Sequence, residues 1–128
     1  MNAMKKELRV LVVEDSEDDV ELIRNELAEA GFAVLCERVE TAASLKAALE
    51  HGFLDMVICD HSLPALDSLS ALEIVREKTV NMPFIIVSGL IHDEVAIEAM
   101  RRGARDFIRK DNLSKLVLVV EREFQEAT

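Results

Sequence analysis

Short apolar runs that end on a polar side chain recur along this chain of 128 residues. In the clearest of them, residues 56–59 read Met-Val-Ile-Cys and Asp60 follows directly. Continuous apolar runs of this length are typical of strands buried on both faces, as in parallel sheets. Parallel strands end at one edge of their sheet, and open α/β sheets bind ligands at that edge. The pattern predicts a site there, made of the groups that end the runs: Glu14, Asp15, Asp60, Ser88 and Lys110.

Helical patterns alternate with these runs and complete five strand–helix units. The strands are predicted at about residues 8–13, 33–39, 56–59, 83–87 and 105–109. The helices are predicted at about residues 17–30, 41–52, 68–78, 93–102 and 112–125, with glycines 31, 52 and 103 closing three of them. Such alternation favours a doubly wound parallel α/β sheet with helices on both faces. Two strand orders are common for these sheets, and periodicity alone leaves both open.

Length and composition bound the class of protein. A chain of 128 residues suits a single domain, and 50% hydrophobic with 31% charged residues is typical of a globular chain. A net charge of −10 argues against direct nucleic-acid binding. No apolar run approaches the roughly 20 residues that cross a bilayer, and no signal peptide is apparent, so we expect no membrane insertion. Cys36 and Cys59 lie in apolar runs, where buried free thiols are expected, and this fits a cytoplasmic chain.

Three carboxylates meet at the predicted edge if the first and third strands are neighbours. Glu14, Asp15 and Asp60 would then repel one another, and each would raise the pKa of the others. A bound divalent cation removes this cost. Oxygen ligands favour Mg²⁺ or Mn²⁺ over zinc, and Mg²⁺ leaves coordination positions free for phosphate oxygens.

The remaining groups suit phosphoryl chemistry. The Ser88 hydroxyl and the Lys110 ammonium can each bind a phosphoryl oxygen. A carboxylate such as Asp60 can attack phosphorus and form an aspartyl phosphate. Phosphoryl transfer needs mostly positioning and charge neutralisation, which the metal and Lys110 would supply.

Each group also has an ordinary structural explanation. Acidic residues after the first strand suit the positive end of a helix dipole: Asp15, Glu17, Asp18 and Asp19. Asp60 alone could cap a loop, Ser88 could belong to an ordinary turn, and Lys110 could be a solvated surface lysine. Their shared position at strand ends favours a site. We expect His61, next to Asp60, to be an exposed loop residue.

Taken in order, these stretches resemble the receiver domain of two-component response regulators. The similarity covers about residues 7–124, and the stretches that match are residues 10–15, 55–60 with 63–64, 85–89 and 103–110. The resemblance implies a flavodoxin-like sheet of strand order 2-1-3-4-5. It also implies a signalling phosphoacceptor rather than a metabolic enzyme. Such a domain catalyses its own phosphorylation, takes part in its own dephosphorylation and receives phosphate from a histidine kinase or phosphotransfer protein.

The resemblance also implies a role for each site residue. Asp60 would be the phosphoacceptor, with Ser88 and Lys110 binding the phosphoryl group. Asp15, Asp60 and the backbone carbonyl of Ser62 would bind Mg²⁺ directly, and Glu14 would bind it through water. Ser88 and Phe107 would move on phosphorylation and change the surface of the fourth helix, fifth strand and last helix.

The chain departs from the usual receiver sequence at three positions. Phe107 replaces a frequent tyrosine, so a hydroxyl-dependent part of the switch is missing. Asp111 follows Lys110 where proline is usual, which leaves the cis peptide of that position open because a non-proline cis bond costs about 2.5–4 kcal/mol. Ser68 replaces a frequent glycine, which suggests a different turn before the third helix. None of these changes removes a phosphotransfer residue.

The last predicted helix carries an apolar stripe that we expect to face the core: residues 113, 116, 117, 120 and 124. Leu118 falls on the opposite side and Val119 at the flank. We hypothesise that Leu118 lies in a homodimer interface or contacts an attached output domain. The chain reaches Thr128 without an output module, so it either acts alone by docking or is a piece of a longer signalling protein.

Two other functions compete with this interpretation. A phosphatase of small molecules could also use an aspartate nucleophile, but such enzymes usually need a cap domain, for which this chain has little room. A degenerate receiver that only binds partners is the second. The five retained residues at the strand ends speak against it.

Overall fold

One parallel sheet organises the computed structural model, which describes residues 6–61, 63–89 and 93–126. Its strands are β1 (Lys6–Val13), β2 (Phe32–Val39), β3 (Met56–Asp60), β4 (Phe84–Ser88) and β5 (Asp106–Arg109). They pair in the order β2-β1-β3-β4-β5, and every pair is parallel. The predicted doubly wound sheet is confirmed, and of the two common orders it has the flavodoxin-like one.

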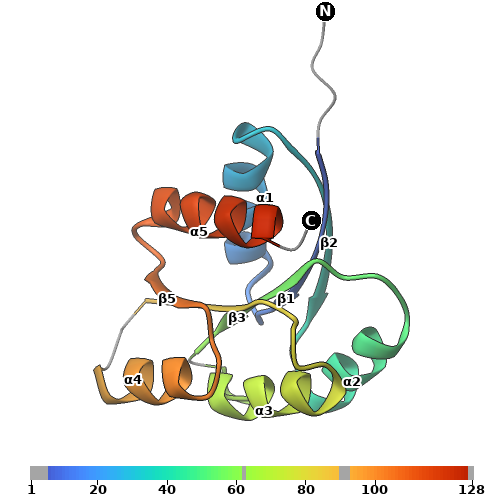
Figure 1. Cartoon of the computed structure of the whole chain (residues 1–128), viewed down its shortest axis with the longest axis vertical. Helices are drawn as coiled ribbons and strands as arrows, with labels where there is room; N and C mark the ends of the chain where they lie inside the picture. Colours follow the sequence, from blue (N-terminus) through green and yellow to red (C-terminus); the bar gives the residue numbers. More distant parts are fainter. Residues whose placement is uncertain (1–5, 62, 90–92, 127–128) are drawn as a thin grey trace, which may run out of the picture.

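Helices cover both faces of this sheet (Figure 1). They are α1 (Glu17–Glu29), α2 (Ala42–Glu50), α3 (Ser68–Lys78), α4 (Asp93–Arg101) and α5 (Leu113–Glu126). Helices α1 and α5 lie on one face, and α2, α3 and α4 lie on the other (Figure 1). Each face has its own apolar core, because alternate side chains of the buried strands point to opposite faces. The sheet is therefore enclosed on both faces, and its strand ends remain accessible at the edge.

Polar caps begin three of the helices where the sequence changes from strand to helix. Ser16 accepts a hydrogen bond from the Asp19 N–H, and Thr41 forms a capping box with Ser44. Asp67 caps α3, so this helix begins at Ser68 as predicted. Each predicted element is present, with bounds that shift by no more than a few residues.

Two glycines that follow helices adopt the left-handed backbone conformation, with positive φ. Gly31, after α1, has a φ of 104° and Gly103, after α4, has a φ of 108°. Beside Gly103, the Arg76 guanidinium of α3 donates to the carbonyl oxygens of Met82 and Gly103, both at 2.7 Å. Arg76 thus ties together the two loops that lead into β4 and β5.

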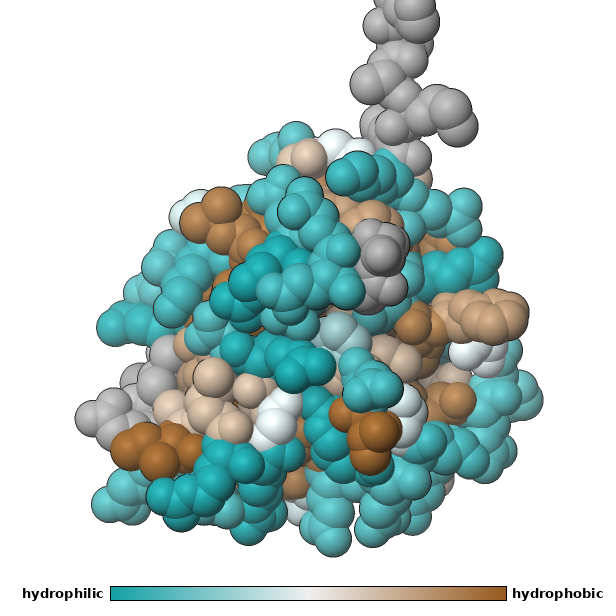
Figure 2. Space-filling model, viewed as in Figure 1, coloured by the Kyte–Doolittle hydropathy of each residue, from teal (hydrophilic) through white to brown (hydrophobic). Residues whose placement is uncertain are grey.

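Helix α5 follows the predicted stripe with one correction. Leu116 and Val120 are fully buried, and Leu118 is 67% exposed, as expected. Val119, expected at the flank, is buried in the core, because the helix presents a wider apolar face to the sheet and α1 than the stripe suggested. On the face shown in Figure 2, exposed apolar side chains form small patches separated by polar ones.

Candidate functional site

The strand register brings the predicted carboxylates together at one edge of the sheet. Val13 of β1 pairs with Cys59 of β3, so Glu14 and Asp15 follow beside Asp60. Ligand oxygens of these three residues lie within 4.8 Å of one another. Glu14 is 2% exposed and Asp60 is 7% exposed, whereas Asp15 faces solvent. Two carboxylates are thus held out of water, and the third lies at the mouth of the site.

Lys110 joins this acidic group from the end of β5. Its backbone N–H donates to the carbonyl oxygen of Ser88 at 2.8 Å, which continues the β4–β5 ladder past the strand. The ammonium Nζ lies 2.9 Å from Oδ2 of Asp60 and 3.1 Å from Oε2 of Glu14. The peptide bonds of the described residues are all trans, Lys110–Asp111 included.

Crowding and burial change the pKa values of these groups. Burial raises the pKa of Glu14 to about 7, and the neighbouring Asp60 adds to this rise by hydrogen bonding and charge. Burial alone would lower the pKa of Lys110, but hydrogen bonds to Asp19, Asp60 and Glu14 outweigh it and raise that pKa. The single ammonium of Lys110 is therefore shared among several carboxylates, and the acidic group retains unfavourable negative charge.

The two predicted switch residues occupy buried positions near the same edge. Ser88 ends β4 and is fully buried, and Phe107 of β5 is 8% exposed. Asp60 pairs with Val87 in the β3–β4 ladder, so Ser88 lies one residue beyond the position level with Asp60. Ser62, the predicted carbonyl ligand, lies outside the described residues.

His61 is not the exposed loop residue that we expected. It is half-buried, its Nδ1 lies 2.6 Å from the Ser68 hydroxyl, and its ring centroid lies 6.1 Å from that of Phe107. The departure at Ser68 accounts for this, because a glycine there would offer no hydroxyl to hold the imidazole. The Ser68–His61 pair therefore brings His61 to the side of a predicted switch residue.

Asp19 is a site residue that the sequence pattern did not reveal. Its Oδ2 lies 2.6 Å from the Lys110 Nζ, closer than the oxygens of Asp60 and Glu14. Helix-dipole stabilisation explained its acidic character at the sequence level, so nothing distinguished it from Asp18. Its contact depends on how the first turn of α1 faces the end of β5, which the sequence alone does not specify.

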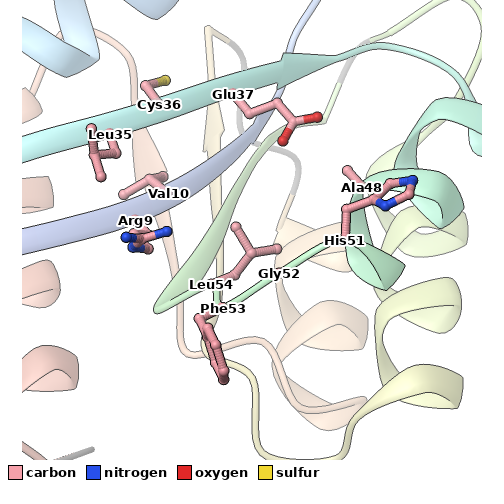
Figure 3. Close-up of a pocket in the computed structure, with 10 residues that line it drawn as sticks. All are labelled: Arg9, Val10, Leu35, Cys36, Glu37, Ala48, His51, Gly52, Phe53 and Leu54. Atoms are coloured by element: carbon pink, nitrogen blue, oxygen red, sulfur yellow. The ribbon is translucent and has the colours of Figure 1, made fainter.

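A cavity among the described residues lies away from the acidic group. It has a volume of about 260 Å³, and the side chains around it come from β1, β2, the end of α2 and the loop before β3 (Figure 3). Its lining includes Leu35, Glu37, His51 and Phe53, and none of the acidic group. This cavity is therefore separate from the acidic group at the strand ends.

The donor set fits a magnesium-type cation. Three carboxylates with clustered oxygens match the hard oxygen ligands that Mg²⁺ and Mn²⁺ prefer. The raised pKa of Glu14 provides a physical reason for the fit, because a cation would relieve the charge that burial and Asp60 make unfavourable. No cysteine or histidine belongs to this group in the described part of the chain.

Comparison with known proteins decides the family. The family model for the response regulator receiver domain matches residues 10–121. This chain is a member of that receiver domain family. It acts as a phosphoacceptor domain in two-component signalling. Members of this family interact with histidine kinases and output domains.

Several curated relatives resemble this receiver domain. A putative NtrX-like response regulator of Rickettsia felis is 37% identical over 91% of the chain, and the regulatory protein AtoC of Escherichia coli is 31% identical over 91%. The matched region makes up 25% of each of these relatives, so the chain spans about a quarter of their length. The chemotaxis protein CheY of Bacillus subtilis is 29% identical, with 80% of this chain and 84% of CheY covered.

Solved structures agree with this assignment. NtrX from Brucella abortus superposes with a TM-score of 0.80 at 31% identity, covering 92% of this receiver domain and 27% of the other chain. The receiver domain of the Francisella response regulator 1452 matches with a TM-score of 0.81 at 24% identity, with 94% and 99% covered, which supports the fold alone. Within its described residues, this receiver domain has no helix long and apolar enough to cross a membrane.

Proposed function

We propose that Asp60 accepts the phosphoryl group from a histidine kinase or phosphotransfer protein, in a magnesium-dependent reaction that the domain itself catalyses. The observation that carries this proposal is the position of Asp60: its Oδ2 lies 2.9 Å from the Lys110 Nζ, and it shares an oxygen cluster with Glu14 and Asp15. This position supports the proposal, because the proposed nucleophile, the Lys110 ammonium and two of the proposed metal ligands would act together at the carboxyl edge of the sheet.

The residues divide the work of phosphoryl transfer. A carboxylate oxygen of Asp60 forms the new bond to phosphorus as the phosphorus–nitrogen bond to the donor histidine breaks. Lys110 and Ser88 bind phosphoryl oxygens, and Lys110 neutralises part of their charge. Asp15, Asp60 and the Ser62 carbonyl would hold the metal directly, with Glu14 acting through water. When bound, Mg²⁺ (or Mn²⁺) neutralises charge on the phosphoryl oxygens and orients them.

A change at Ser88 and Phe107 would carry the signal. Ser88 moves toward the phosphoryl group, and Phe107 adjusts beside it, altering the surface made by α4, β5 and α5. The contact between the Phe107 and His61 rings supports this role, because His61 directly follows the phosphoacceptor. The switch would here depend on ring packing, since Phe107 has no hydroxyl.

Chemical phosphorylation tests the acceptor. We expect Mg²⁺ and acetyl phosphate to produce one acid-stable, base-labile adduct on the wild-type chain, detected by intact-mass spectrometry. Asp60→Asn should abolish it, and Asp67→Asn, which changes an exposed cap of α3, should not. The same adduct at the same site in Asp60→Asn would refute the assignment. Repeated turnover of phosphate esters would instead favour the phosphatase alternative.

We also propose that Leu118 belongs to the output surface. It is 67% exposed on α5, a helix that packs on β5. A homodimer or an attached output domain would cover it. Sedimentation of wild type and Leu118→Glu, each with and without trifluoroberyllate as a phosphoryl mimic, tests the homodimer. We expect a mimic-dependent dimer that Leu118→Glu disrupts, and a monomer in every case would contradict it.

A further inference from the structure

Lys110 is shared among three carboxylates, and one of them lies outside the acidic group. A lysine ammonium has three N–H donors. Oxygens of Asp19, Asp60 and Glu14 lie at 2.6, 2.9 and 3.1 Å from Nζ, so each donor has an acceptor in reach. Asp60 and Glu14 belong to the sheet edge, whereas Asp19 belongs to the first turn of α1.

The surroundings of Asp19 favour a well-defined contact with Lys110. The Asp19 N–H donates to the Ser16 hydroxyl at 3.2 Å, which fixes the start of α1. The two charged side chains are 32% and 26% exposed. Both side chains line a small pocket of about 20 Å³, whose other walls are apolar side chains: Leu22, Ile23, Val87 and Leu113. Partial exclusion of water makes such an ion pair stronger than one on the open surface.

The three contacts would respond differently when phosphorylation begins. Asp60 would become the attacking group and Glu14 would bind the metal through water, so both would change their contacts with Lys110. Asp19 takes part in neither event and can keep its contact throughout. A lysine side chain without a fixed partner has many rotamers, so a permanent contact with Asp19 reduces the conformational entropy that Lys110 must lose on binding the phosphoryl group.

We propose that Asp19 is a positioning residue that holds the Lys110 ammonium beside Asp60, ready for the incoming phosphoryl group. The inference rests on the proposed function of Asp60 and Lys110. It has a competitor of opposite sign: the negative charge of Asp19 could simply repel an anionic phosphodonor. Positioning makes Asp19 helpful to phosphorylation, and simple repulsion makes it harmful.

The rate of phosphorylation by acetyl phosphate with Mg²⁺ separates these effects. We expect Asp19→Asn to lower the rate by roughly tenfold, because a small misplacement of a catalytic group has a large effect on rate. Asp18→Asn is the matched control, because it removes the same charge from the same helical turn at an exposed position. It should leave the rate unchanged or raise it slightly. Asp19→Glu should recover most of the wild-type rate.

Two further measurements show whether Asp19 acts through Lys110. In a Lys110→Gln background, Asp19→Asn should cause no additional loss. Without metal or phosphodonor, nitrogen-15 NMR of the Lys110 ammonium should show greater mobility in Asp19→Asn than in Asp18→Asn. Circular dichroism and thermal melting check that each variant is folded, and Asp19→Ser repeats the test with a side chain suited to a helix N-terminus.

The outcomes distinguish the inference from its foundation. Equal rates in Asp19→Asn and Asp18→Asn, or a faster rate in Asp19→Asn, would overturn the positioning role. An unchanged Lys110 ammonium signal would do the same. If the wild type carries no phosphoryl group on Asp60, the proposed function fails instead.

Discussion

At the scale of single residues, the site is dominated by unequal numbers of charges. Glu14 is 2% exposed, and burial together with Asp60 raises its pKa to about 7. Lys110 compensates only in part, because it also serves Asp60 and Asp19. The metal-free domain therefore contains unfavourable repulsion between carboxylates. A cation that binds there gains affinity because it relieves this repulsion.

The raised pKa of Glu14 predicts how the free energy of unfolding changes with pH when a chelator keeps the domain free of metal. The folded-state pKa of Glu14, about 7, is above its ordinary value of 4.5, so the stabilising contribution of the bound proton is complete below about pH 4.5. It is lost as pH rises through about 7. We expect the wild type to lose about 3.5 kcal/mol across this window from Glu14, because its pKa rises from 4.5 to about 7 on folding and each pKa unit is equivalent to about 1.4 kcal/mol.

Urea denaturation of metal-free protein at pH 5, 6, 7 and 8 measures this dependence. Glu14→Gln mimics the protonated side chain, so its unfolding free energy should fall less steeply with pH than that of the wild type. Glu17→Gln, which changes an exposed acid of α1, should keep the wild-type slope. Parallel profiles for wild type and Glu14→Gln would contradict the prediction.

Some residue positions could be predicted from the sequence, and those of His61 and Asp19 could not. The roles assigned to strand-end residues stay predictions, but their grouping followed from polar residues at the ends of buried runs. His61 and Asp19 could not be placed in this way. The position of His61 depends on the hydroxyl of Ser68 seven residues later, and that of Asp19 on the packing of α1 beside β5.

At the scale of elements, helix termini could be predicted closely because their signals are local. Thr41 caps the start of α2 by hydrogen bonding with Ser44, and Gly103 follows the end of α4 with a left-handed backbone, so both signals involve only neighbouring residues. The face that α5 buries was predicted less well. Val119 is buried because α5 meets both the sheet and α1, and Glu123 is 5% exposed because Arg105 lies 3.0 Å from it. Both depend on neighbours distant in sequence.

The two left-handed glycines provide a matched test at this scale. Gly31→Ala should cost about 1 kcal/mol, because the site is open and only the backbone conformation opposes a side chain. Gly103→Ala should cost more, about 2 kcal/mol, because its Cβ would lie 3.0 Å from Nε of Arg76. That arginine cannot move away without weakening its bonds to two carbonyl oxygens.

Denaturant midpoints of the two variants check this order. In Gly103→Ala, additional removal of the guanidinium by Arg76→Met should cost less than it does in the wild-type background, because the arginine is already displaced. Equal losses of stability in the two glycine variants would show that the Arg76 contact has no energetic importance.

At the scale of the whole molecule, strand order is what gathers the site. Periodicity predicted the parallel sheet and left two strand orders open. The resemblance to receivers selected 2-1-3-4-5, which is confirmed. This order places β1 and β3 side by side, so carboxylates 45 or more residues apart in sequence share one edge.

Binding of a cation at this edge should stabilise the entire domain. A ligand that binds only the folded state at 100 times its dissociation constant adds about 2.7 kcal/mol. We expect Mg²⁺ to raise the melting temperature and a chelator to reverse this rise. Asp15→Asn should raise the melting temperature of the metal-free domain, because one repelling charge is lost, and should reduce the response to Mg²⁺.

Calorimetric melting with increasing Mg²⁺ measures both effects. Asp18→Asn is again the control, since it changes net charge equally but lies outside the acidic group. A response to Mg²⁺ that is as large in Asp15→Asn as in the wild type would exclude Asp15 as a ligand.

The Arg76 bridge gives the two edges of the sheet different mechanical characters. At the edge where β4 and β5 begin, a guanidinium binds two backbone carbonyls, an arrangement that gains nothing from rearranging when a phosphate arrives. At the opposite edge, the Lys110 ammonium contacts the carboxylates of Asp60 and Glu14, and the charge of an added phosphoryl group would change these contacts. We therefore expect a chemical event at the carboxyl edge to displace the last residues of β4 and β5 while the first residues of these strands stay in register.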